Sequence, residues 1–208
     1  MHQQQGDLLT PSLSVVIPHW PFDDEIDEAL RRCVTSLPSD CEKVVVVNDG
    51  TGFGKNVNVG LRLASGDFIG VVNNDAHVAH GDVYDLCLPG AVASPLVIGD
   101  TPAVAPPLET GGFHGCFWIA PREVLDCVGL LDNRFEGASG RTTICSCACA
   151  RPGSRRDRSR PCAVMHRGGL TMLKVPGRAA EWYGANERRF EEKWGWAPPP
   201  TEPGSSDD

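Results

Sequence analysis

Lysine and long apolar runs are both scarce in this chain. Of its 19 basic residues, 15 are Arg and four are Lys, and 27 acidic residues bring the formal net charge to −8. Because binding to nucleic-acid phosphates needs a basic face, we expect no nucleic-acid partner. No apolar run approaches the roughly 20 residues of a membrane-spanning helix, so we also expect no membrane span.

Features typical of secreted proteins are lacking too. The first twelve residues are mostly polar and contain no signal-peptide core. The nine Cys are an odd number, which argues against a complete disulfide framework. We therefore expect a cytoplasmic protein. Apolar residues make up 41% of the 208 residues, which is enough for a packed core between disordered ends at 1–12 and 197–208.

Common catalytic signatures are absent as well. The sequence contains neither a nucleophile-elbow Ser pattern nor an HExxH zinc pattern. The glycine-rich segment Gly50–Lys55 has some likeness to a phosphate-binding loop, but that pattern needs Gly in place of Asp49 and Ser or Thr in place of Asn56. We interpret the segment as a turn that follows a strand.

Short apolar runs alternate with amphipathic segments in the first half of the chain, which predicts an α/β fold. Helices between successive strands favour a parallel sheet with crossover connections. Ligands bind at the carboxyl ends of such strands, and polar residues stand there at 48–49 and 73–75. The predicted strands are 13–18 (ended by Pro18), 43–47 and 67–72, and the predicted helices are 23–36 and 56–64.

The second half of the chain is patterned more weakly. Residues 138–160 show no periodicity that predicts a helix or a strand. The remaining predicted elements are strands at 91–98, 116–120 and 163–166, helices at 121–128 and 179–194, and a turn at 129–135.

Seven short segments follow one another along the chain: VVIP, VVVVNDG, N-x-G, ASGD, VVNNDAHV, GCFWIAPREVLDCVGLLDNRF and CAVMHRGG. Their order resembles that of the family 2 glycosyltransferases, in particular a rhamnosyltransferase-like bacterial branch. The resemblance covers about residues 13–135 and 161–196. It implies a GT-A fold of the nucleotide-diphospho-sugar transferase type, mainly a parallel sheet flanked by helices, with a nucleotide-binding half (13–80) and an acceptor half (81–196).

The resemblance also implies an activity. A sugar would move, with inversion, from a nucleoside-diphosphate sugar to a hydroxyl of a glycan or lipid-linked glycan in bacterial glycan synthesis. A lipid-linked acceptor would favour a peripheral position at the inner membrane face. The departing diphosphate needs a divalent cation, Mg²⁺ or Mn²⁺, and such hard cations take oxygen ligands.

Site residues follow from the same resemblance. The metal ligands would be Asp75, at the end of an Asp-x-Asp-like motif that reads Asn-Asn-Asp here, and His166. Gly115 and Asp132 would face the acceptor. The resemblance assigns no catalytic base, and Asp132 is the one candidate for it. The donor-binding residues would be Pro18, His19, Asp49, Asn58, Asn73 and Asn74.

The acidic catalytic segment of this family is missing where it is expected, after Phe135. The family has an acidic pair there, followed by Leu and Arg, and one carboxylate is the general base that deprotonates the acceptor. Here no carboxylate stands between Ala138 and Asp157. We interpret the stretch from about Ser139 to Arg160 as a local out-of-frame translation.

Other interpretations of the chain stay open. One is a catalytically impaired relative that binds nucleotide sugars without transferring them. The Arg residues between 151 and 160 would grip phosphates or form a solvated loop. Another is a zinc module with thiolate ligands. Its ligands would come from Cys145, Cys147, Cys149, Cys162 and His166.

The frameshift predicts the codons of the gene. We expect Thr142 to Ala150 to be encoded by ACG ACG ATC TGC TCG TGC GCC TGC GCG. Read one nucleotide earlier, from the last G of the Arg141 codon, this DNA encodes Asp-Asp-Asp-Leu-Leu-Val-Arg-Leu-Arg, which restores the missing motif. Sequencing the gene checks this, and other codons at these positions would rule the frameshift out.

Overall fold

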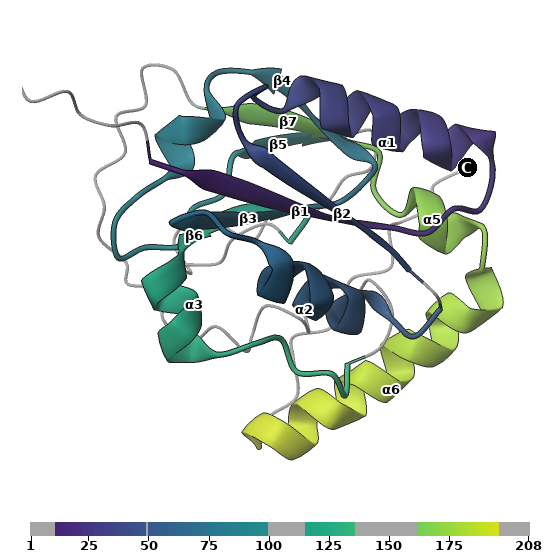
Figure 1. The fold of residues 1–208 in the computed structure, drawn as a ribbon. Helices are drawn as coiled ribbons and strands as arrows, with labels where there is room; N and C mark the ends of the chain where they lie inside the picture. The colour runs from purple at the N-terminus through teal and green to yellow at the C-terminus, as the bar shows by residue number, and fades with distance from the viewer. Residues whose placement is uncertain (1–10, 49, 100–114, 136–161, 196–208) are drawn as a thin grey trace, which may run out of the picture.

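A computed structural model gives the fold and describes residues 11–48, 50–99, 115–135 and 162–195. Two β-sheets lie between packed helices (Figure 1). Residues 1–10 and 197–208 of the expected disordered ends, and the segment 139–160, lie outside the described residues. The strands are β1 (Leu13–His19), β2 (Glu42–Val47), β3 (Phe68–Val72), β4 (Ala76–His80), β5 (Leu96–Gly99), β6 (Phe117–Pro121) and β7 (Ala163–His166). The helices are α1 (Asp24–Ser36), α2 (Phe53–Leu63), η1 (Val83–Leu86), α3 (Arg122–Val128), α5 (Leu170–Leu173) and α6 (Pro176–Trp194).

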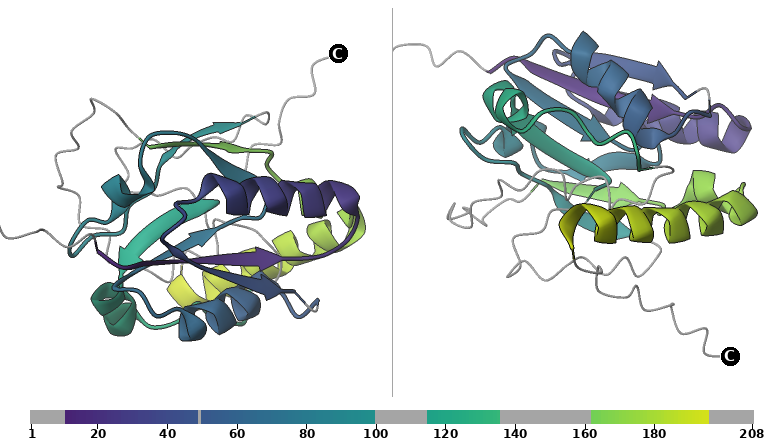
Figure 2. Two further views of the ribbon diagram at one scale, coloured as in Figure 1. Left: turned by 45° about the horizontal axis from the view of Figure 1, so that its top comes forward. Right: turned by 90° about the horizontal axis from the view of Figure 1, so that it is seen from below.

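The main sheet confirms the predicted α/β fold. Its strand order is β2-β1-β3-β6, with β1 parallel to both β2 and β3, and β6 antiparallel to β3. The crossover helix α1 lies on one face of this sheet, and α2 and α3 lie on the other (Figure 2). Because β1, β2 and β3 are parallel, their carboxyl ends lie at the same edge of the sheet.

Strand β1 is the centre of the core, because it is buried on both faces of the sheet. All seven of its residues are buried. Val15 and Ile17 belong to the apolar cluster on the α1 side, while Val16 belongs to the cluster on the α2 side. This alternation explains why the strand reads as a continuous apolar run, as buried parallel strands do.

The prediction that Pro18 ends this strand is wrong. β1 continues to His19, with Pro18 in register with Val46 of β2. The His19 carbonyl accepts a hydrogen bond from the Asn48 backbone N–H at 2.7 Å, so the backbone N–H and C=O of His19 point toward β2. The backbone groups of its neighbour Pro18 therefore point to the other side, toward β3. Pairing with β3 on that side ends at Val16, so the missing N–H of Pro18 breaks no hydrogen bond.

The smaller sheet has the order β4-β7-β5 and contains one strand that the sequence did not predict. β4 reads AHVAH, in which a single β-branched residue gives little strand signal. β4 forms a strand because it pairs antiparallel with β7. β5 is shorter than predicted and covers only the last three residues of 91–98 and one residue beyond.

Two helices begin three residues earlier than predicted. α2 begins at Phe53 rather than Asn56, directly after Gly52, whose φ of 115° favours glycine. α6 begins at Pro176 rather than Ala179, because Pro suits the first turn of a helix, where its missing N–H has no intrahelical partner. Among the described residues, no helix combines the length and apolar character needed to cross a bilayer.

Gly60 lets α2 pack closely on β1, and this contact generates a prediction. A Cβ at Gly60 would overlap the buried Val16 side chain. We expect Gly60→Ala to lower the free energy of unfolding by about 1–3 kcal/mol, although Ala alone favours a helix by about 1 kcal/mol. Urea unfolding measures the change.

Gly184→Ala in α6 is the matched control, since among the described residues only the Arg188 guanidinium, at 3.8 Å, lies within contact distance of a Cβ there. We expect this change to be neutral or stabilising by up to about 1 kcal/mol. Equal effects of the two substitutions would contradict the close packing of Gly60 on Val16.

Candidate functional site

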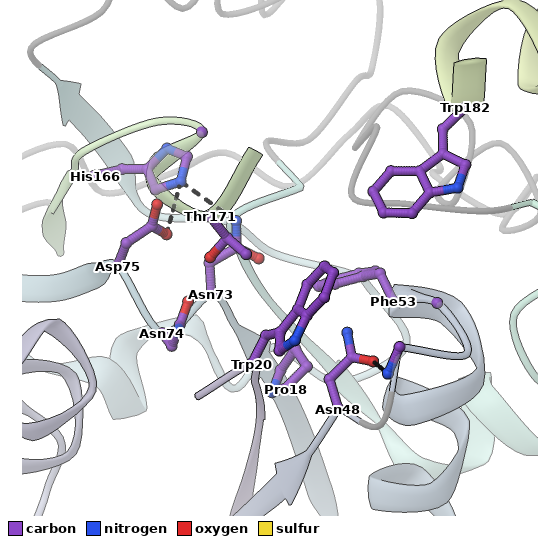
Figure 3. Close-up of a pocket in the computed structure, with 13 residues that line it drawn as sticks. Pro18, Trp20, Asn48, Phe53, Asn73, Asn74, Asp75, His166, Thr171 and Trp182 are labelled. Carbon is purple, nitrogen blue, oxygen red and sulfur yellow. Dashed lines mark hydrogen bonds and ion pairs between the residues drawn. The ribbon is translucent and has the colours of Figure 1, made fainter. Parts of the chain in front are cut away.

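A pocket opens at the sheet edge where β1, β2 and β3 end (Figure 3). The space between its walls is about 840 Å³ when the solvent at its open mouth is included. The strand ends contribute Pro18, Trp20, Asn48, Asn73, Asn74 and Asp75. The turn into α2 and the segment from β7 to α6 contribute Gly50, Gly52, Phe53, His166, Gly169, Thr171 and Trp182.

Asp75 and His166, the two residues predicted to bind metal, are brought together in this pocket. His166 Nε2 lies 3.2 Å from Asp75 Oδ1, and the side chains are 10% and 6% exposed. The Leu170 backbone N–H donates to the other carboxylate oxygen of Asp75 at 3.3 Å. Hydrogen bonds of this kind offset part of the cost of burying a charged group.

Asn73 completes this cluster and contains an unpaired atom. Its Nδ2 lies 3.3 Å from His166 Nε2. Its Oδ1 is buried and, among the described residues, has no hydrogen-bond partner. Such an atom is costly unless something binds it. A carboxylate, an imidazole and an amide side chain are therefore in contact here, and the carboxylate oxygens, the imidazole nitrogen and the unpaired amide oxygen are suitable ligand atoms for Mn²⁺ or Mg²⁺.

The described residues contain no group of three or more His, Cys, Asp or Glu side chains that is arranged to hold a metal ion. A cation at this site would therefore depend on the Asn73 oxygen in addition to Asp75 and His166. The Asn at the first position of the motif gives the site less negative charge than a pair of Asp would give.

Asn74 lines the pocket, but His19 does not. The His19 ring is 5% exposed and lies behind Asn74, whose Nδ2 is 3.0 Å from His19 Nδ1. On its other side the ring contacts Asp27 of α1. His19, which we expected among the donor-binding residues, is therefore in contact with the pocket only through another side chain.

The turn between β2 and α2 is held by Asn48. Its Oδ1 accepts hydrogen bonds from the Gly50 backbone N–H at 2.8 Å and from Asn56 Nδ2 at 3.0 Å. Positive φ angles at Gly50 and Gly52 allow the chain to turn within this short distance. Asp49, predicted to bind the donor, lies outside the described residues.

Aromatic side chains give the pocket its apolar surface. Trp20 packs edge-to-face on Phe22, with ring centroids 6.1 Å apart. Phe53 stands at the start of α2, and Trp182 stands across the pocket on α6 (Figure 3). None of the three was predicted from the sequence as a site residue. Only Trp20 carried a usable signal, because it follows directly on the carboxyl end of a predicted strand.

Asn58, another predicted donor-binding residue, does not line the pocket. It is 1% exposed, and its Nδ2 donates to the Leu131 carbonyl at 2.8 Å and to Asn133 Oδ1 at 2.6 Å. Its Oδ1 accepts from the Leu131 backbone N–H at 2.9 Å. These bonds fasten α2 to the turn at 129–135.

Asp132 also lies outside the pocket lining and is clamped by two cations. Arg134 binds both of its carboxylate oxygens, and Lys193 Nζ of α6 lies 2.9 Å from Oδ2. The hydrogen bonds from Arg134, followed by those from Lys193, hold the pKa of Asp132 well below its ordinary range. A carboxylate with so low a pKa takes up a proton poorly, so this geometry favours an anchoring role.

The remaining predicted site residues are dispersed. Gly115 stands before β6 and does not line the pocket. Of the proposed zinc ligands, Cys145, Cys147 and Cys149 lie outside the described residues. Cys162 is buried, and burial raises the pKa of its thiol to about 12, whereas a zinc ligand must be a thiolate.

Solved structures share this fold, whereas no family model and no curated protein sequence matches the chain. Mannosyltransferase PcManGT from Pyrobaculum calidifontis, in complex with GDP-Man and Mn²⁺, matches with a TM-score of 0.59 and 21% identity over 91% of this chain. S. aureus TarS 1-349, in complex with UDP-GlcNAc, matches with a TM-score of 0.51 and 12% identity over 86%. This chain spans 66% of each of those chains. The fold is therefore a GT-A-like glycosyltransferase fold, as predicted.

The clamp on Asp132 generates a prediction about pH. Because its pKa is depressed in the folded state, its stabilisation is present above the ordinary Asp pKa of about 4 and is lost as the pH falls below that value. We expect Asp132→Asn to cost about 1 kcal/mol of unfolding free energy at pH 7 and less at pH 3. Urea unfolding at the two pH values measures this, with exposed Asp126→Asn as control. An equal loss of unfolding free energy at pH 7 and at pH 3 would contradict the stabilising role of the Asp132 ion pairs.

Proposed function

We propose that this protein is a glycosyltransferase that moves a sugar from a nucleoside-diphosphate sugar to a hydroxyl acceptor, with inversion and with a divalent cation. One observation carries the proposal. A buried carboxylate, a buried imidazole and an amide whose oxygen has no partner among the described residues are in contact beside the carboxyl ends of parallel strands, where they line a pocket. In open α/β sheets this edge is where ligands bind.

Asp75, His166 and Asn73 would hold the cation. A divalent cation bound there, Mg²⁺ or Mn²⁺, would neutralise the diphosphate as it leaves the sugar. The mannosyltransferase with the same fold contains Mn²⁺ together with GDP-Man, which supports this choice of cofactor. The Leu170 N–H binds one carboxylate oxygen of Asp75 and so helps to hold the other oxygen, Oδ1, beside His166.

The two sides of the pocket would bind different parts of the donor and acceptor. Trp20 and Phe53 line the β1–α2 side together with Pro18 and Asn48, and an aromatic wall beside polar groups suits a nucleobase and ribose. Trp182 and Thr171 line the opposite wall and would face the sugar and its acceptor. This division agrees with a nucleotide-binding half at 13–80 and an acceptor half at 81–196, which we propose as the organisation of the chain.

In an inverting transfer, a base takes the acceptor proton while the oxygen attacks the sugar carbon opposite the diphosphate. Asp75 is the only carboxylate among the described residues that line the pocket, and it belongs to the cation site. The base would come from the altered segment 139–160 in its restored reading frame. With the segment as translated here, the described lining offers no carboxylate besides Asp75, which favours a second candidate, a relative that binds nucleotide sugars without transferring them.

The acceptor is proposed from the resemblance alone. A glycan or lipid-linked glycan of bacterial glycan synthesis would present the hydroxyl. A lipid-linked acceptor would bring the protein to the inner membrane face, while a free glycan would leave it in the cytoplasm.

The cation site predicts how nucleotides bind. We expect GDP or UDP to bind more tightly with Mn²⁺ than without it, and Asp75→Asn to weaken the Mn²⁺-dependent affinity at least about tenfold. The substitution keeps the shape of the side chain and removes its charge. Calorimetric titration measures the affinity, and thermal unfolding shows whether the variant is folded.

Asp126→Asn, on the exposed side of α3, is the matched control and should bind like the wild type. Binding that is indifferent to both Mn²⁺ and Asp75 would contradict the cation site. No binding of either nucleotide would contradict the proposed function. Binding without donor turnover would favour the second candidate.

A further inference from the structure

His19 lies between two polar side chains, one from α1 and one from the pocket. Its Nε2 is 3.1 Å from Asp27 Oδ1, and its Nδ1 is 3.0 Å from Asn74 Nδ2. His19 is 5% and Asn74 6% exposed, so water offers little competition for the hydrogen bond between them, whereas the Asp27 side chain is 48% exposed. The three residues come from α1, the end of β1 and the turn after β3.

This geometry determines which ring nitrogen of a neutral His19 carries the hydrogen. An ionised carboxylate only accepts hydrogen bonds, so Nε2 must donate to Asp27. Nδ1 is then an acceptor, and only the Nδ2 group of Asn74 can donate to it. An Asp that fixes the tautomer of a His in this way is a recurring arrangement in enzymes.

The tautomer in turn orients the Asn74 amide. With Nδ2 directed at His19, Oδ1 must point away from the ring, and Asn74 lines the pocket beside Asp75 (Figure 3). Within the described part of the chain, no hydrogen bond to this oxygen is found. It is therefore available to a bound molecule with an O–H group.

We propose that His19 is a positioning residue: Asp27 fixes its tautomer, and His19 fixes the Asn74 amide so that its oxygen faces the pocket. The partner of that oxygen would be a ribose hydroxyl of the nucleotide or a water molecule on the bound cation. This role rests on the proposed function, since it requires a nucleotide in the pocket. It explains why a buried His and a charged helix residue stand behind a pocket that neither of them lines.

The tautomer is tested without any ligand. ¹⁵N NMR of labelled full-length protein distinguishes the two neutral tautomers of His19, and His19→Gln assigns its signals among the six His. We expect the Nε2–H form in the wild type. We expect a mixture in Asp27→Asn, because an Asn side chain both donates and accepts. A wild-type Nδ1–H form would overturn the proposal.

The positioning role is tested by binding. We expect Asp27→Asn to weaken UDP or GDP binding up to about tenfold, which corresponds to one hydrogen bond. In the Asn74→Ala background the same change should have no further effect. Asp24→Asn removes the same charge from an exposed position in the first turn of α1 and should bind like the wild type. If Asp27→Asn weakens nucleotide affinity only in samples that contain Mn²⁺, the partner of Asn74 Oδ1 is the cation-bound water. If the affinity also falls without Mn²⁺, the partner is the ribose.

An undiminished effect of Asp27→Asn in the Asn74→Ala background would show that Asp27 acts through α1 packing, and would overturn the positioning role. If the wild type binds no nucleotide, the proposed function fails and the role in nucleotide binding fails with it. The NMR result would still decide whether Asp27 sets the tautomer, so the two failures are distinguishable.

Discussion

The parallel pairing of β1 with both β2 and β3 is the constraint on which the site depends. Because all three strands run the same way, the residues after them gather at one edge, although they stand far apart in sequence. The pairing needs β1 to be buried on both faces, which its alternating contacts with the two apolar clusters provide. Gly60 lets α2 approach closely enough to complete one of these faces.

The smaller sheet positions the opposite wall of the pocket, which includes His166. β7 pairs with β4, which directly follows the turn holding Asp75, so the end of β7 places His166 beside that carboxylate. Lys174 also bridges to Asp23 and Glu25 at the start of α1, but exposed ion pairs contribute little free energy. The strand pairing and the buried Asp75–His166 contact therefore define the position of this wall more firmly than the surface charges do.

The sequence predicted the elements whose signal is local. The strands around 13–18, 43–47 and 67–72 have β-branched runs, and polar residues that follow them line the pocket at this edge of the sheet. β4 was missed because its order comes from pairing with β7. The roles of Asn58 and His19 were equally hidden, since an Asn or His has the same local pattern whether it faces a ligand or a distant turn. Trp182 was predicted only as part of a helix, because α6 reaches the pocket through tertiary packing alone.

The charge of the pocket bears on how the proposed donor and cation would bind. Among the described lining residues Asp75 is the single carboxylate, and the positions before it hold neutral Asn. One buried negative charge attracts a divalent cation less strongly than two would. A nucleoside diphosphate brings its own negative charges, which would complete the neutralisation of the cation. On the proposed function, the cation would therefore enter with the nucleotide rather than ahead of it. The neutral amides would then act by directed hydrogen bonds, which is the kind of contact that the fixed orientation of Asn74 supplies.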